Sequence, residues 1–293
     1  MSLIDFILNL AGLLLLANWR AQPRDTTRLA PPATLVGTLR RADRPALRGW
    51  QFPAVLGLLL FLRALIYWQI GPAVNWTGIL DLGVVSISFR SDYFWRMLLF
   101  SGLSFGLMFW VFLLWLLLLS LLRPPAGEPF VFQSFLRANL GAADAWPRGL
   151  KLMLPLVAAA IGWWLLTWPL AHWGIVPRPV STAHRFEQAL VIGLGSYLTW
   201  KYVIAAVLIL HLLNSYIYFG KHPLWNYVDK VARRILVPLR TLPLRLGRLD
   251  FAPVVMLALV FLVCELVAGG RAVWFFGWRK VPGLVDLYLR LPL

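Results

Sequence analysis

Three ionisable side chains stand inside long apolar runs of the sequence, where a charge is costly. They are Arg63, Lys201 and Glu265, and a charge at the middle of a bilayer costs roughly 3 kcal/mol or more unless it is paired or hydrated. Counted along the predicted helices, Arg63 and Glu265 reach depths that differ by about 3 Å. We expect Glu265 to face other helices and to pair with Arg63 or Lys201. The pair would fix helix register or serve a proton relay, and a lone carboxylate favours the first.

A second group of charges suits the binding of phosphate rather than a reaction. It surrounds an amphipathic segment, 224–237, in which Leu224, Val228 and Val231 recur at helical spacing. Each Lys or Arg near an anionic membrane surface contributes about 1 kcal/mol. The candidate lipid-binding residues are Lys230, Arg233, Arg234, Arg240, Arg245 and Arg248. The alternative is that these residues only set the orientation of the chain in the membrane.

Other patterns that carry chemistry are missing from the sequence. It contains no zinc-protease HExxH, no GxSxG, no P-loop and no dinucleotide fingerprint. Its one cysteine, Cys264, excludes an intrachain disulfide. His211 and His172 are each possible axial ligands of haem or chlorophyll, but they fall at opposite predicted membrane faces. We therefore expect no enzyme activity, no metal and no cofactor.

The composition indicates an integral membrane protein. Of 293 residues, 60% are hydrophobic and only 14% are charged, and the mean hydropathy is +0.73. A soluble domain is less apolar than this. A net charge of +16 in a soluble chain would suggest nucleic acid, but here the arginines flank apolar runs, where lipid head groups and membrane orientation account for them. We expect no nucleic-acid partner.

The apolar runs predict an all-α polytopic protein of about six transmembrane helices. The predicted spans are 2–19, 52–70, 97–122, 150–168, 189–213 and 252–270. The first lacks the features of a cleaved signal peptide, so we expect it to be retained. Long basic connections, which include the amphipathic stretches 130–140 and 224–237, alternate with short ones. The shorter connection 71–96 has an alternating stretch that need not be embedded.

This alternation occurs three times and predicts three helical hairpins with amphipathic interfacial helices in their basic connections. The predicted domains are residues 1–71, 72–170 and 171–273, followed by an interfacial tail, 274–293. The connections inside the hairpins hold 17 Lys and Arg, and those between them hold 4. By the positive-inside rule the basic connections face the cytoplasm of a bacterial inner membrane, and both termini are periplasmic.

The last hairpin carries a recognisable proline and glycine pattern. Its residues are His222-Pro223, Pro238-Leu239-Arg240, Gly247 and Leu249-Asp250-Phe251-Ala252-Pro253. In this spacing the segment resembles the repeat of the YggT (YlmG) family of small integral membrane proteins. The departures are His222, Thr241 and Pro243. The resemblance covers about residues 215–270, with a decayed copy at 120–170. It makes Pro223, Pro238, Gly247, Asp250 and Pro253 structural motif residues.

The resemblance implies an envelope or organelle-membrane protein linked to division, membrane organisation or cytochrome assembly, without catalytic residues to transfer. Three functions remain open. The first is a non-catalytic scaffold or assembly subunit that binds anionic lipids and other membrane proteins within a larger hetero-complex. The second is a transporter or channel component that uses Arg63, Lys201 and Glu265. The third is a haem- or pigment-binding subunit. We favour the first, because the sequence has amphipathic and basic segments suited to binding lipids and proteins but no pattern typical of a reaction centre.

Overall fold

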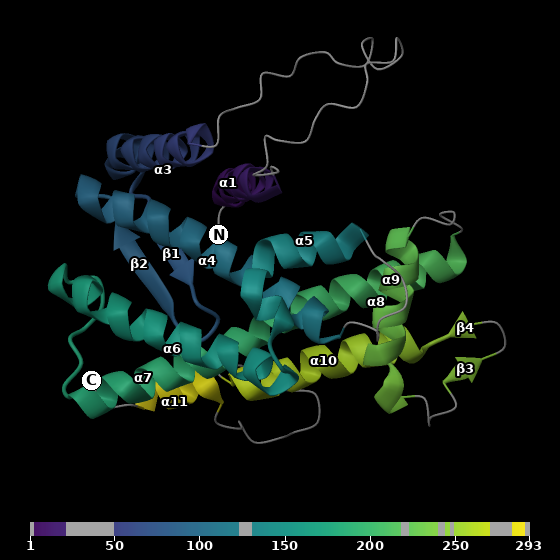
Figure 1. The fold of residues 1–293 in the computed structure, drawn as a ribbon. Coiled ribbons are helices and arrows are strands. Elements are labelled where there is room, and N and C mark those ends of the chain that lie inside the picture. The colour runs from purple at the N-terminus through teal and green to yellow at the C-terminus, as the bar shows by residue number, and fades with distance from the viewer. Residues whose placement is uncertain are drawn as a thin grey trace, which may run out of the picture. The chain divides into compact units, whose positions relative to one another are not determined.

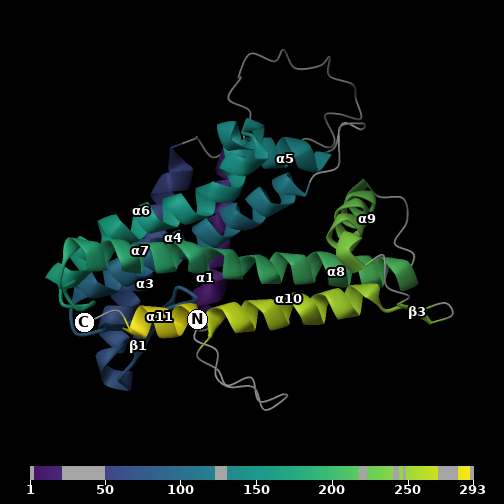
Figure 2. The same ribbon diagram turned by 90° about the horizontal axis from the view of Figure 1, so that it is seen from below.

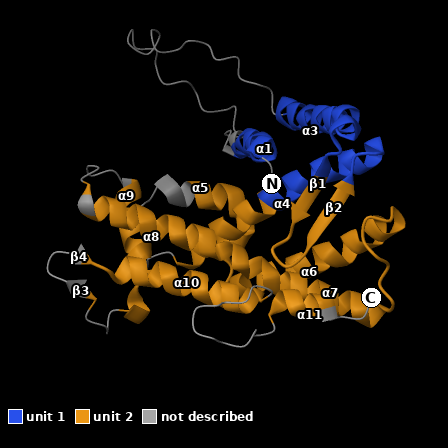
Figure 3. Cartoon of the chain, turned by 180° about the vertical axis from the view of Figure 1, so that it is seen from behind, with its two compact units in different colours: residues 1–77, 90–108 blue, residues 78–89, 109–293 orange. Residues whose placement is uncertain are grey.

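The chain is mostly helical in the computed structural model (Figure 1). The structure describes residues 3–21, 50–122, 131–217, 223–239, 244–246, 249–269 and 283–290. They form two compact units, which Figure 3 distinguishes by colour. Unit 1 comprises residues 1–77 and 90–108, and unit 2 comprises residues 78–89 and 109–293. The division into three hairpins stays a prediction.

The described residues of unit 1 form three helices and a short turn. They are α1 (Leu3–Ala21), α3 (Gln51–Ile70), the 3-10 turn η1 (Pro72–Val74) and the first part of α4 (Phe94–Leu121). Helix α1 packs against α3. It also approaches α4 closely at Gly12, where an added Cβ would lie 2.8 Å from the Phe105 ring. Only glycine allows that approach.

Unit 2 holds the rest of α4 and most of the remaining elements. The helices are α5 (Val131–Leu140), η2 (Gly141–Ala145), α6 (Arg148–His172), α7 (Thr182–Gly195), η3 (Ser196–Thr199), α8 (Trp200–Tyr216), α9 (Pro223–Ile235), η4 (Val237–Leu239), α10 (Ala252–Ala268) and α11 (Leu284–Arg290). Helix α6 packs on α7, and α8 packs on both α9 and α10. In Figure 2, α8 and α10 run side by side and α9 crosses α8.

Among the described residues, four helices are long and apolar enough to cross a membrane. They are Gln51–Ile70, Phe94–Leu121, Arg148–His172 and the combined helix Thr182–Ser215. They coincide with the predicted second to fifth spans. The apolar parts of α1 (Leu3–Ala17) and of α10 (Ala252–Ala268) are shorter. At 1.5 Å per residue, the 17 residues of α10 span about 26 Å, against a hydrocarbon core of about 30 Å.

The combined helix begins earlier than the sequence pattern predicts. We expected an exposed connection up to residue 188, but α7 starts at Thr182, where the Ser181 side chain accepts a hydrogen bond from the His184 N–H. The 3-10 segment η3 lies between α7 and α8. Its first residue, Ser196, donates its hydroxyl hydrogen to the Gly193 carbonyl. Such back-bonding by serine distorts helices locally.

In the part of the chain that the structure describes, two small β-hairpins interrupt the helices, and the all-α prediction did not include them. Strands β1 (Thr77–Asp81) and β2 (Ser86–Arg90) pair within the predicted connection 71–96. Alternate residues of each are buried, which explains the alternating sequence pattern. The second hairpin pairs β3 (Arg245–Leu246) with β4 (Leu249–Asp250) antiparallel, with Arg245 opposite Asp250.

The amphipathic helix α9 is part of the protein core. Its residues Val231 and Ala232 are fully buried, and Val228 and Ile235 are nearly so. They pack with Leu208 of α8, and partly buried residues of α4 and α10 complete the cluster. The sequence predicted a helix that lies on something apolar. The structure shows that other helices of unit 2 cover this side.

Candidate functional site

Arg63 is the centre of a buried polar network in unit 1. Only 2% of the residue is exposed. Its guanidinium donates to Asp5 Oδ1 at 2.7 Å, to Asn9 Oδ1 at 2.6 Å and to Ser104 Oγ at 3.1 Å. Tyr67 also donates its hydroxyl hydrogen to Asp5, at 2.6 Å. Because these groups come from α1, α3 and α4, the network ties three apolar helices together.

The prediction gave Glu265 either Arg63 or Lys201 as its partner, and of these two the structure pairs Glu265 with Lys201. The structure pairs Arg63 with Asp5, a carboxylate that the prediction did not consider. A signal was present in the sequence. Asn9 lies about two turns after the start of α1, and Arg63 lies about two turns before the end of α3. If the two spans run in opposite directions, both residues lie about 10 Å from the same membrane face. Asp5 and Asn9 are also four residues apart, on one face of α1.

Lys201 and Glu265 are brought together in unit 2. Lys201 Nζ of α8 lies 3.4 Å from Glu265 Oε1 of α10, and the side chains are 15% and 37% exposed. The Lys201 ammonium also lies 5.3 Å from the centroid of the Tyr202 ring and 5.8 Å from that of Phe261. The contact joins two helices that pack along their length, but its long distance and its exposure make it weaker than the Arg63 network.

The basic side of α9 points away from the cluster that buries its apolar side. Lys230 and Arg233 are exposed. Arg234 is half-buried, and its guanidinium donates to the Leu122 carbonyl at 3.3 Å. Arg245 lies in β3, and Arg240 and Arg248 lie outside the described residues. Within the described part of the predicted lipid-binding set, Lys230 and Arg233 therefore present their charges outward.

Side chains of α9 also donate hydrogen bonds to backbone carbonyls at the end of α4. The Tyr227 hydroxyl donates to the Leu119 carbonyl at 3.2 Å, in addition to the contact of Arg234 with Leu122. The last carbonyls of a helix have no partner within it and carry a partial negative charge. A cationic side chain at this point provides a hydrogen-bond donor and offsets the partial negative charge. Arg234, which the sequence analysis assigned to lipid, thus has a contact inside the protein.

His211 of α8 contacts Asp229, which lies in the middle of α9. Its Nδ1 lies 2.8 Å from Asp229 Oδ1, and Asn214 Nδ2 donates to the other carboxylate oxygen at 3.0 Å. These side chains hold the middle of α9 against the last turns of α8. No group of three or more metal-ligating side chains occurs among the described residues. His172, the other candidate ligand, stacks on Trp168 with their ring centroids 6.0 Å apart.

A further polar cluster joins α4, η2 and α6, and the sequence analysis did not identify it. Lys151 Nζ donates to Ser120 Oγ at 2.8 Å, and Ser120 donates to Asp144 Oδ1 at 2.6 Å. A serine beside a lysine is one form of activated nucleophile. Here, however, Lys151 is ion-paired with Asp144 at 3.8 Å, and an ammonium group has no lone pair with which to accept the serine proton. The cluster therefore has a structural role, because its buried contacts hold α4, η2 and α6 together.

The proline motif residues mark the ends of helices where the structure describes them. Helix α9 starts at Pro223 and ends at Ile235, ahead of the exposed Pro238. Asp250 Oδ1 accepts the Ala252 N–H at 3.0 Å, at the start of α10, and Pro253 is buried in the first turn of that helix. Gly247 lies outside the described residues.

Comparison of the chain with protein-family models, with curated proteins and with solved structures finds no match.

Proposed function

We propose that the protein is a multi-pass scaffold of a bacterial inner membrane, which binds anionic lipids at its cytoplasmic side and packs against partner proteins in a hetero-complex. The observation that carries this proposal is the orientation of α9. The helix crosses the end of α8 (Figure 2), its apolar side is buried, and Lys230 and Arg233 are exposed. A helix across the end of a membrane span lies near the head groups, where such charges attract anionic lipid.

The remaining features of the proposal come from the sequence pattern. Helices α1 and α10 complete six spans as three hairpins, the positive-inside rule places α9 in the cytoplasm and both termini in the periplasm, and the YggT-like motif is consistent with a membrane-organising role. The polar groups inside the apolar helices support a scaffold rather than a transporter. Arg63 is occupied by Asp5 and Asn9, and Lys201 by Glu265, so these charges join helices.

Retention of anionic lipid tests the proposal. The protein is placed in nanodiscs of phosphatidylcholine and phosphatidylglycerol, and the retained lipids are counted by native mass spectrometry. We expect Arg233→Gln and Lys230→Gln each to weaken phosphatidylglycerol retention about fivefold, since one cation contributes about 1 kcal/mol. The matched control is Arg178→Gln, which removes one exposed charge just before the other end of the α7–α8 helix.

Equal losses in all three variants, or no preference for phosphatidylglycerol over phosphatidylcholine, would contradict the lipid-binding role. The scaffold role has a separate test, which is purification of the native protein in a mild detergent followed by size-exclusion chromatography. We expect a defined complex with other membrane proteins. Elution of the protein by itself would argue against an assembly subunit.

A further inference from the structure

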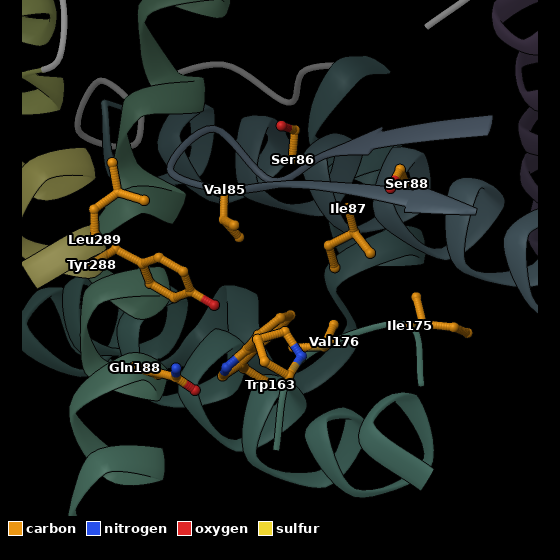
Figure 4. Close-up of a pocket in the computed structure, with 11 residues that line it drawn as sticks. Val85, Ser86, Ile87, Ser88, Trp163, Ile175, Val176, Gln188, Tyr288 and Leu289 are labelled. Atoms are coloured by element: carbon orange, nitrogen blue, oxygen red, sulfur yellow. The ribbon is translucent and has the colours of Figure 1, made fainter. Parts of the chain in front are cut away.

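A cavity of about 220 Å³ lies within unit 2, and none of the residues considered so far as functional lines it. Strand β2, helices α6, α7 and α11 and the loop between α6 and α7 surround the cavity (Figure 4). Pockets for drug-sized ligands have volumes of roughly 300–1,000 Å³. This cavity is smaller, so it suits one small ring or head group rather than a whole lipid.

Two polar side chains in the wall of the cavity are more than nine-tenths buried. Trp163 of α6 is 3% exposed, and its indole Nε1 has no hydrogen-bond partner among the described residues. Gln188 of α7 is 4% exposed, and its Nε2 lies 2.8 Å from His184 Nε2. A buried donor without a partner costs about 1–3 kcal/mol. A ligand with an acceptor for Trp163 would recover that cost, and the Gln188 carbonyl can accept a ligand hydroxyl.

A further hydroxyl group comes from α11. The Tyr288 side chain of α11 reaches into the cavity, with its hydroxyl directed toward the side where Trp163 and Gln188 lie (Figure 4). Burial raises the pKa of the Tyr288 phenol above its usual value, so the hydroxyl stays protonated. Ser86 and Ser88 of β2 also border the cavity, but their side chains point away from it, to the face of the strand opposite Ile87 (Figure 4).

The rest of the lining determines the charge and shape of a fitting ligand. None of the residues that line the cavity is charged, and Ile87, Val176 and Ile175 give it an apolar side. A charged ligand would lose its hydration without gaining a counter-charge, which is costly. A hydroxyl group both donates and accepts hydrogen bonds, so it can satisfy an indole N–H and an amide oxygen in one site.

We propose that this cavity binds a neutral hydroxylated ring with one apolar face, which is the chemistry of a sugar. The ring is supplied either as a free monosaccharide or as the head group of a glycolipid. Trp163 and Tyr288 donate hydrogen bonds to ring or hydroxyl oxygens, Gln188 accepts one, and Ile87 and Val176 contact the C–H face. This site is separate from the lipid-binding face of α9, so either proposal can fail without the other.

Binding measurements on the full chain in phosphatidylcholine nanodiscs test the proposal. Free glucose is titrated by saturation-transfer difference NMR, and a monoglucosyl diacylglycerol is compared with plain diacylglycerol by native mass spectrometry. We expect binding in at least one arm, and that arm identifies the source of the ring. Loss of one hydrogen bond in Trp163→Phe or in Tyr288→Phe should weaken binding about two- to tenfold.

The matched controls are Trp168→Phe on the same helix and Tyr93→Phe, whose side chains are 70% and 63% exposed; both should bind as the unsubstituted protein does. If Trp163→Phe fails to fold, Tyr288→Phe carries the test, with an unchanged helical circular dichroism spectrum as the sign of an intact protein. Absence of glucose and glycolipid binding would overturn the proposal and leave a cavity that holds water. Binding that Tyr288→Phe leaves unchanged, or that the controls weaken equally, would overturn it as well.

Discussion

Neutralising Asp5 should destabilise unit 1, because the substitution leaves the Arg63 charge buried without its carboxylate. The two charges lie 2.7 Å apart, and their side chains are 1% and 4% exposed. At an effective dielectric constant of about 20, their attraction is about 6 kcal/mol before the cost of desolvation. Removing one partner of a buried ion pair costs about 3–5 kcal/mol. We expect Asp5→Asn to fall near the lower value, since asparagine can still accept a hydrogen bond from Tyr67.

A double substitution distinguishes stabilisation by the Asp5–Arg63 ion pair from stabilisation by side-chain packing. Arg63→Met by itself leaves the Asp5 carboxylate buried, so we expect a loss of about 3–5 kcal/mol again. The double variant Asp5→Asn/Arg63→Met buries no charge and should lose less stability than either single variant. The two effects should therefore be strongly non-additive.

The assay is reversible unfolding in mixed micelles of increasing sodium dodecyl sulfate, followed by circular dichroism. Ser101→Ala is the control, because this fully buried hydroxyl donates a neutral hydrogen bond to the Leu60 carbonyl at 2.8 Å. Its loss should cost about 1 kcal/mol. Additive losses in the double variant, or an Asp5→Asn loss no larger than that of Ser101→Ala, would refute the reasoning.

Three further predictions follow from single contacts in unit 2. Gly193→Ala places a Cβ 2.7 Å from a backbone carbonyl oxygen of α6 and should lower stability by about 1–3 kcal/mol in the same assay; Gly162→Ala, which meets open space, should be neutral or gain up to about 1 kcal/mol. Glu265→Gln should cost about 1 kcal/mol or less, because its contact with Lys201 is 3.4 Å long and partly exposed; a loss of stability as large as that of Asp5→Asn in the same assay would contradict this. Tyr288 has a raised pKa through burial, so its neutral form stabilises the fold below the usual phenol pKa and this contribution is lost as pH rises through the folded value. The absorbance difference between the protein and Tyr288→Phe should therefore show ionisation above the ordinary tyrosine range, and ionisation within that range would place the phenol in solvent.

Local sequence patterns predicted most of the helices and several of their ends. Apolar runs of span length gave the positions of four candidate spans, because length and hydropathy are properties of consecutive residues. The spacing of Val228 and Val231 predicted α9 and its buried side for the same reason. Asp250 was a predicted structural motif residue just before the sixth span, and it accepts the Ala252 N–H at the start of α10.

Partners of buried charges were harder to predict, because they depend on contacts between distant helices. Hydropathy places Arg63 and Glu265 at similar depths, but depth does not determine which helices meet. Asp5 was overlooked, although it is the carboxylate that contacts Arg63. The Ser120–Lys151 contact joins residues 31 positions apart and has no signature in either local segment.

The sequence by itself determined that apolar helices dominate the chain and that cations gather around one amphipathic helix, since both follow from residue type and spacing. Only the tertiary structure decided what covers each helix. It showed that the apolar side of α9 packs on protein, that Arg234 contacts the end of α4, and that Trp163, Gln188 and Tyr288 meet around one cavity. These contacts depend on how helices cross in space, which the order of residues along one helix does not specify.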